Sequence, residues 1–180
     1  MSKTIDTLKR IFSDSFIEAS HDNISEPKED MVRKICKGGI ADEDILICRL
    51  DQEGGSNYAD PFPYIKGDSV NHGLRGMKRV SDYVMFVDKD GVLFVLIFEL
   101  KKGKESPKEQ LDVTEPLIDF IFNRAKILKH FGEIKYEVRK IGITEEVGKR
   151  STSERGEIIY DNRFVKLYRG KYIYLRKLLH

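Results

Sequence analysis

The sequence predicts an α/β fold in which helices flank a mixed β-sheet. Three observations carry this prediction. Apolar residues recur at helical spacing near the N-terminus and again after position 106. Strand-like apolar segments stand before and after that second helix. The longest apolar run, VLFVLIF at 92–98, is far too short to span a membrane and is typical of a central strand.

Length and composition favour one domain over residues 1–180. A chain of 180 residues with 40% hydrophobic and 34% charged residues is long enough to form a sizeable core. The N-terminus lacks the apolar core of a secretory signal, so we expect a cytoplasmic protein that does not associate with membranes. Cys36 and Cys48 form no CxxC pair, which argues against a disulfide framework or a cysteine-held metal.

Two helices and a strand are expected before position 51. The first helix covers about residues 4–19, where apolar residues form one stripe. The second covers about residues 26–37, with Pro27 in its first turn and Gly38-Gly39 as its stop. DILICRL at 44–50 is expected to be a strand, and the segment 54–76, rich in Gly, Pro and Asn, a long loop.

A β-hairpin is predicted around Asp90-Gly91, because Asp-Gly between two apolar runs is a strong signal for a two-residue turn. In that register the numbers of opposed residues sum to 181, which places Asp82 opposite Glu99. Lys101 shares a face with Glu99, since side chains alternate along a strand. A turn shifted to Lys89-Asp90 preserves this face, whereas a three-residue loop would not.

The second half of the chain is predicted to hold one long helix and three strands. Ser106-Pro107-Lys108-Glu109 has the pattern of a capping box with proline at the first helical position. The helix is expected to run to about position 130, with a kink or break near Pro116. Strands follow at about 136–144, 163–168 and 171–178. The last two are expected to form a C-terminal β-hairpin within residues 160–180, joined by a turn at Arg169-Gly170.

Opposed carboxylates at the end of a buried strand indicate a metal site. Asp82 and Glu99 would repel each other unless a cation lies between them. Oxygen ligands without histidine or thiolate suit Mg²⁺ or Mn²⁺. Such an ion can orient a water and polarise a phosphoryl oxygen. Lys101 could lower the pKa of that water or stabilise charge in the transition state.

The same residues resemble the motif of the PD-(D/E)xK phosphodiesterase superfamily, which includes many restriction and repair nucleases. Asp82 precedes the triplet Glu99-Leu100-Lys101 by seventeen residues, with a hairpin between them. The resemblance implies a restriction endonuclease-like core over about residues 25–144. It also implies that Asp82 and Glu99 are metal ligands, that the main-chain carbonyl of Leu100 is a third, and that Lys101 is the catalytic lysine.

Further residues extend this resemblance. Gln110, in Glu-Gln-Leu, is similar to the Gln-Leu pair that follows the motif in RecB-like nucleases. Family members often add a glutamate from the first core helix, and the resemblance points to Glu29 for this role, with Glu26 as the alternative. Ser81 stands where the motif has proline, which is a departure that many members tolerate.

The expected function is that of an Mg²⁺- or Mn²⁺-dependent endonuclease that hydrolyses phosphodiester bonds, with DNA favoured over RNA. Arg169, Lys171 and Arg176, in the basic C-terminal segment, are the predicted nucleic-acid contacts. The alternative is a nuclease-fold module that binds nucleic acid or a partner protein without cutting. No P-loop motif is present, so cleavage is not expected to be coupled to NTP hydrolysis. The resemblance is compatible with a homodimer and with a role in phage defence or repair.

Overall fold

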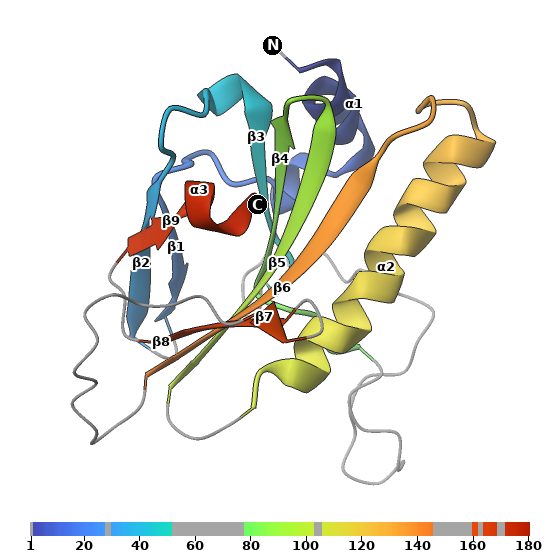
Figure 1. Ribbon diagram of the computed structural model, residues 1–180. Coiled ribbons are helices and arrows are strands. Elements are labelled where there is room, and N and C mark those ends of the chain that lie inside the picture. The colour runs from blue at the N-terminus through green and yellow to red at the C-terminus, as the bar shows by residue number, and fades with distance from the viewer. Residues whose placement is uncertain are drawn as a thin grey trace, which may run out of the picture.

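The chain forms an α/β structure with mixed sheets flanked by helices, as the sequence predicts. A computed structural model describes residues 2–27, 30–51, 78–102, 106–145, 160–161, 164–168 and 172–180. The described elements are arranged in three layers (Figure 1). A six-stranded sheet lies in the middle, with helices on one face and a smaller three-stranded sheet on the other. The predicted loop at 54–76 lies outside the described residues.

The large sheet has the strand order β3-β4-β5-β6-β8-β7. β5 pairs antiparallel with β4 and parallel with β6, so the sheet is mixed. The strands predicted at 44–50 and 136–144 are confirmed as β3 and β6. The bounds are β3 Ile45–Arg49, β4 Tyr83–Lys89, β5 Val92–Lys102, β6 Tyr136–Glu145, β7 Tyr160–Asp161 and β8 Phe164–Tyr168.

The predicted hairpin register is confirmed. Lys89 pairs with Val92 and Tyr83 with Phe98, so paired residue numbers sum to 181. Asp90 and Gly91 have φ of 53° and 77°, the left-handed values that a type I′ turn requires at both central positions. Every residue from 93 to 100 is buried, because both faces of β5 are covered. Residues 92–98 of the strand are all apolar for that reason, and Glu99 is the one charged residue within the buried stretch 93–100.

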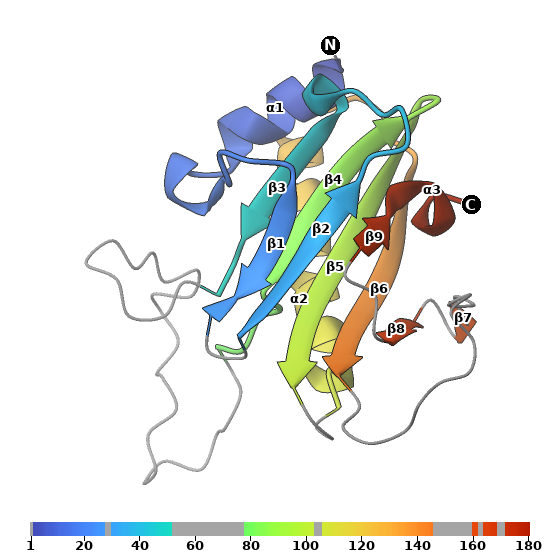
Figure 2. The ribbon, with the colours of Figure 1, turned by 90° about the vertical axis from the view of Figure 1, so that its left-hand side faces the viewer.

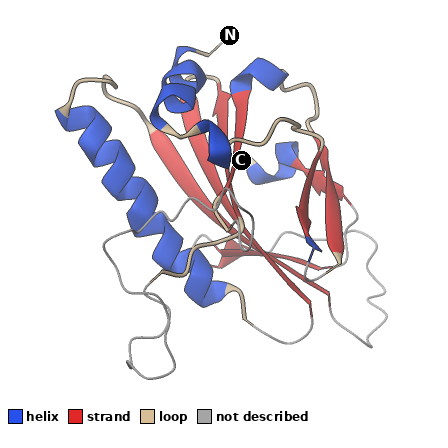
Figure 3. Ribbon diagram, turned by 180° about the vertical axis from the view of Figure 1, so that it is seen from behind, coloured by secondary structure: helices blue, strands red, loops and turns tan. Residues whose placement is uncertain are grey.

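Two helices cover one face of the large sheet (Figure 3). α1, Lys3–Ile11, is shorter than predicted and is followed by a 3₁₀ turn at Asp14–Phe16. Its cap is the Ser2 hydroxyl, which accepts a hydrogen bond from the Ile5 amide at 3.2 Å. Phe12 leaves the helix in an extended conformation but still packs on this core. The predicted helix to position 19 is therefore wrong after position 11.

α2, Lys108–Ile127, connects β5 to β6 and lies along the sheet (Figure 1). The helix is continuous across Pro116, so the predicted break is absent. The Ser106 hydroxyl accepts a hydrogen bond from the Lys108 amide at 3.3 Å. The Glu109 carboxylate instead forms an ion pair with Arg79, which lies just before β4, at 3.3 Å. The predicted capping box is therefore not formed, since it would need the Ser106 hydroxyl to accept from the Glu109 amide, and Pro107 precedes the helix instead of being its first residue.

The opposite face of the large sheet carries the small sheet, with order β1-β2-β9, and the short helix α3 (Figure 2). β2 pairs antiparallel with β1 and parallel with β9. A 3₁₀ turn at Asp42–Asp44 leads from this sheet back to β3. The bounds are β1 Asn23–Glu26, β2 Met31–Cys36, β9 Tyr172–Tyr174 and α3 Leu175–Leu178.

The helix predicted at 26–37 is wrong, because this segment is the β1-β2 hairpin. Met31, Arg33 and Ile35 are buried and alternate with exposed Val32 and Lys34, which is the period of a strand. The turn closes with a bond from the Asp30 amide to the Pro27 carbonyl at 3.1 Å. Apolar residues at 31, 32 and 35 also fit one turn of a helix, so the short pattern did not discriminate.

The predicted C-terminal hairpin is also wrong. β8 pairs with β6 in the large sheet, whereas β9 pairs with β2 in the small sheet. The strand expected at 171–178 ends at Tyr174, after which Leu175 begins α3. Adjacent strands in sequence are thus separated into two layers. None of the described helices is long and apolar enough to cross a membrane.

Candidate functional site

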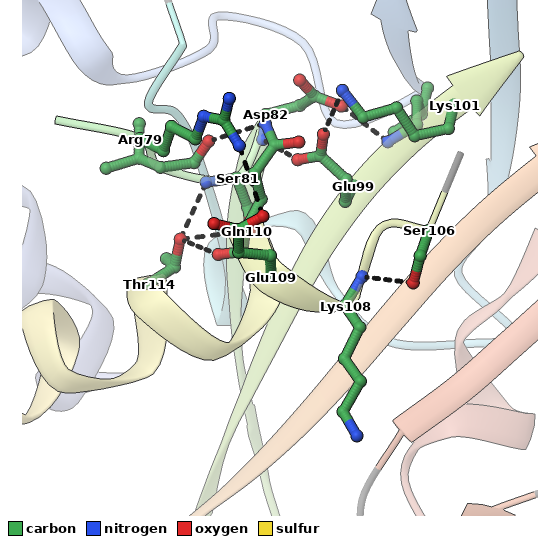
Figure 4. Close-up of polar contacts among 12 residues, drawn as sticks. Arg79, Ser81, Asp82, Glu99, Lys101, Ser106, Lys108, Glu109, Gln110 and Thr114 are labelled. Atoms are coloured by element: carbon green, nitrogen blue, oxygen red, sulfur yellow. Dashed lines mark hydrogen bonds and ion pairs between the residues drawn. The ribbon is translucent and has the colours of Figure 1, made fainter. Parts of the chain in front are cut away.

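The polar residues of the motif meet at one end of the large sheet, opposite the Asp90-Gly91 turn (Figure 4). Asp82 immediately precedes β4, while Glu99 and Lys101 lie near the end of β5. Asp82 is 4% exposed and Glu99 is fully buried. The structure therefore brings together the three residues that the hairpin register predicted, beneath the surface of the protein.

Backbone hydrogen bonds hold the two carboxylates across the strand pair. The Asp82 amide donates to Glu99 Oε2 at 3.2 Å, and the Leu100 amide donates to Asp82 Oδ2 at 2.6 Å. Each carboxylate therefore accepts a hydrogen bond from a backbone amide of the chain segment that carries the other carboxylate. This exchange fixes both side chains by β-sheet geometry, which a rigid site requires.

Lys101 supplies the positive charge of the site. Its Nζ lies 3.0 Å from Glu99 Oε1, and its side chain is 20% exposed. The contact is an ion pair by distance, but its angle leaves Oε1 without a well-formed hydrogen bond among the described residues. A buried carboxylate oxygen in that condition is costly and has capacity for a further partner.

Burial raises the pKa of both carboxyl groups. The pKa of Asp82 is raised to about 7, chiefly by desolvation and also by the nearby charge of Glu26, against the opposing effect of the Leu100 hydrogen bond. Desolvation and then the charge of Asp82 raise the pKa of Glu99 to about 8. The two groups are close enough to titrate as a pair. At neutral pH, without an added cation, the pair therefore retains a proton.

Two more carboxylates affect this pair. Glu26 is buried on β1, next to the site, and it reaches Asp82 from a strand rather than from the predicted helix. Asp51, two residues after the end of β3, also raises the pKa of Asp82. The sequence reasoning missed Asp51, although its place at the end of a predicted strand was a usable signal. Glu29 lies outside the described residues.

Tyr83 explains why β1 approaches the site. Its hydroxyl donates to the Ser25 carbonyl at 2.7 Å and accepts from the Ser25 amide at 3.3 Å. These two bonds join the small sheet to β4 beside the adjacent residues Glu26 and Asp82. The Arg49 guanidinium lies 5.8 Å from the Tyr83 ring and adds a second cation near this end of the sheet.

α2 is attached to the segment that precedes Asp82. Gln110 Nε2 donates to the Val80 carbonyl at 3.4 Å. Thr114 Oγ1 accepts from the Ser81 amide at 2.7 Å and is buried, as is Ser81. A proline at position 81 has no amide hydrogen and could not make this bond. Gln110 thus holds backbone next to the carboxylate pair, and Thr114, which the sequence reasoning missed, is part of the same support.

Of the predicted nucleic-acid contacts, only Arg176 lies within the described residues, and it is not at this site. Arg169 and Lys171 lie outside the described residues. Arg176 is on α3, where its side chain packs over Gly38 and lines a shallow depression with Lys89 and His180. Lys89 belongs to the hairpin end of β4, so this depression lies at the opposite end of the strand from Asp82.

The donors present fit a hard divalent cation with few protein ligands. In the described ranges, no group of three or more His, Cys, Asp or Glu residues that could hold a metal ion is found. Mg²⁺ often uses one or two carboxylates and retains several waters. Asp82 and Glu99, with the under-satisfied Oε1, meet that requirement. The carbonyl of Leu100 as a third ligand stays a prediction.

Comparisons of the chain with protein-family models, with curated proteins and with solved structures found no match.

Proposed function

We propose that this protein is a metal-dependent nuclease with a restriction endonuclease-like core, which hydrolyses phosphodiester bonds in DNA in preference to RNA. The observation that carries the proposal is the buried Asp82–Glu99 pair with Lys101 Nζ 3.0 Å from Glu99 Oε1. Two desolvated carboxylates facing each other destabilise a fold. Their most direct use is to hold a cation.

The arrangement of elements supports the proposal. The antiparallel strands β3, β4 and β5, followed by α2 and the parallel strand β6, lie within the range over which the motif resemblance extends. The β1-β2 hairpin stands where the resemblance implies a first core helix, and this is a departure from it. The departure brings Glu26 to the site in place of a helix-borne glutamate.

Asp82 and Glu99 would hold the metal, Mg²⁺ or Mn²⁺, with the Leu100 carbonyl and Glu26 or Glu29 as additional donors. Such an ion, when bound, activates a water and offsets negative charge on the phosphate. The contribution of the chain is to fix both carboxylates by the Asp82 and Leu100 amide bonds. Lys101 adds a fixed positive charge where the attacking water and the phosphate would lie. Gln110 and Thr114 hold the backbone on which Asp82 is carried.

The outer face of the small sheet supports contact with nucleic acid. Tyr172 and Tyr174 are about half exposed, and their ring centroids lie 6.2 Å apart. Lys34 pairs with Tyr172 in the strand register, and Lys177 Nζ lies 5.4 Å from the Tyr174 ring. Exposed aromatic rings beside lysines suit stacked bases and phosphates. Arg169, Lys171 and Arg176 remain proposed contacts as well.

The decisive experiment is cleavage of plasmid and single-stranded DNA and RNA with Mg²⁺, Mn²⁺ or EDTA. Lys101→Ala should bind DNA and metal but lose most of the single-turnover rate, because the carboxylates are untouched. Lys102→Ala, one residue along β5 and exposed, is the matched control and should keep the rate. Equal rates in both variants would contradict the assignment of Lys101.

A second candidate is a module that binds nucleic acid or a partner protein without cutting. The observation that favours it is that both carboxylates already accept backbone hydrogen bonds, a structural use that needs no metal. This candidate predicts no thermal shift on adding Mn²⁺ and no cleavage under any metal condition. The nuclease, in contrast, predicts a thermal shift on adding Mn²⁺ and metal-dependent cleavage.

A further inference from the structure

The outer face of α2 carries an apolar stripe that no described element covers. Four large side chains on or just after this helix are exposed: Val113 (40%), Phe120 (58%), Ile127 (78%) and Leu128 (57%). Figures 1 and 3 show α2 at the edge of the molecule, with its outer face turned away from the sheet. The inner residues of α2 pack on the large sheet and are a separate set, which includes Leu111, Ile118 and Phe122.

The spacing of these residues is regular. Val113, Phe120 and Ile127 are each seven residues apart, and seven residues of α-helix return to almost the same direction. They therefore form one straight line along the helix, which is the geometry of a helix–helix contact. The guanidinium of Arg124 lies 5.6 Å from the Phe120 ring and is part of the same line.

The charges of α2 are divided between its two halves. Residues 109–119 hold four carboxylates and no basic residue, whereas residues 120–130 hold three basic residues and no carboxylate. Arg79 pairs with Glu109, and Lys140 on β6 pairs with both Asp112 and Glu115, so the four carboxylates with these two cations keep a net charge of −2. Arg124 and Lys126 are exposed in the basic half.

We propose that two copies of this chain associate through α2, with the two helices antiparallel about a two-fold axis near Phe120. In that register paired residue numbers sum to 240, so Val113 of one copy meets Ile127 of the other and the two Phe120 rings meet at the axis. The interface is self-complementary, as a two-fold contact requires. A parallel pair would align the same stripe, but it would place the three basic residues of one copy against the same three basic residues of the other copy.

The surface is of a size that supports a weak dimer. Taking roughly 200 Å² for a fully exposed large side chain, the four residues contribute on the order of 400 Å² of apolar surface per copy. With its polar rim, the pair would bury about 1,200 Å², the low end for a specific interface. We therefore expect a dissociation constant in the micromolar range.

Sedimentation velocity of the full chain from about 1 to 200 μM tests the proposal. The wild type should shift from monomer to dimer with concentration. Phe120→Glu should weaken association at least tenfold, because it places two like charges at the axis. Val32→Glu changes a side chain of similar exposure (56%) on the small sheet, and association should be unchanged. A wild type that stays monomeric at 200 μM, or equal effects of the two substitutions, would overturn the proposal.

Disulfide trapping tests the orientation separately from the affinity. In a Cys36→Ser background, an oxidised mixture of Val113→Cys and Ile127→Cys chains should give mixed crosslinked dimers. Each variant alone should give few, because equal positions in an antiparallel pair are about 20 Å apart along the helix axis. Self-crosslinking that equals or exceeds mixed crosslinking would overturn the antiparallel arrangement.

Discussion

Replacing Glu99 by glutamine should stabilise the metal-free protein at high pH and leave its stability nearly unchanged at low pH. Glu99 is fully buried, and its Oε2 accepts the Asp82 amide bond. Glutamine has nearly the same shape and keeps an oxygen acceptor for that amide. The substitution therefore removes the charge of the carboxylate and little else, apart from the ion pair with Lys101.

The size of the effect follows from the pKa of Glu99, which is raised from 4.5 to about 8 in the fold. Each pH unit corresponds to about 1.4 kcal/mol, so the full cost of ionising this group in the fold is on the order of 4–5 kcal/mol. The lost ion pair and relaxation around the site offset part of it. We expect a net gain of about 2–3 kcal/mol in the free energy of unfolding at pH 9.

The direction of the pH dependence follows from the same shift. A carboxyl group whose pKa is raised in the fold binds its proton more tightly there than in the unfolded chain. The wild type should therefore be most stable below about pH 4.5 with respect to this group, and should lose that contribution as the pH rises to about 8. Asp82 acts in the same direction through its own raised pKa.

Urea unfolding in EDTA and a reducing agent at pH 5 and pH 9 measures this difference. Glu133→Gln is the matched control, because Glu133 is an exposed carboxylate between α2 and β6, next to the end of the sheet that lies opposite the site. The control should follow the wild type within about 0.5 kcal/mol at both pH values. If Glu99→Gln also follows the wild type at pH 9, the buried-pair reasoning is refuted.

Two further predictions concern the same site, and a third concerns the outer face of the small sheet. Mn²⁺ should raise the melting temperature more at pH 8.5 than at pH 6, since metal binding must displace the proton of the carboxylate pair. Asp82→Ala should abolish both this thermal shift and cleavage. An equal thermal shift in the variant would contradict the proposed metal site. Thr114→Val should cost about 1–3 kcal/mol in urea unfolding, because the buried Ser81 amide loses its acceptor, whereas Val32→Thr at an exposed position of β2 should cost under 0.5 kcal/mol. Tyr172→Ala with Tyr174→Ala should weaken binding of single-stranded oligonucleotides by about 1–3 kcal/mol per stacked base in fluorescence anisotropy with EDTA, and unchanged affinity would place the substrate elsewhere.

Local signals in the sequence determined the part of the fold that carries the motif. Asp90-Gly91 set the turn, because left-handed backbone at both positions favours these residue types, and the turn set the pairing of Asp82 with Glu99 through strand geometry. The unbroken apolar run of β5 predicted a strand covered on both faces. These features depend on neighbours a few residues apart, so a single sequence was sufficient for them.

The tertiary structure decided what depends on partners distant in the chain. The 26–37 segment fits a helix or a hairpin locally, and packing of Met31 and Ile35 on the large sheet selects the hairpin. β8 and β9 are adjacent in sequence, but their pairing partners, β6 and β2, lie in different layers. The approach of Glu26 to Asp82 depends on that same packing. Strand pairing and burial are set by the whole core, whose contacts a local pattern does not contain.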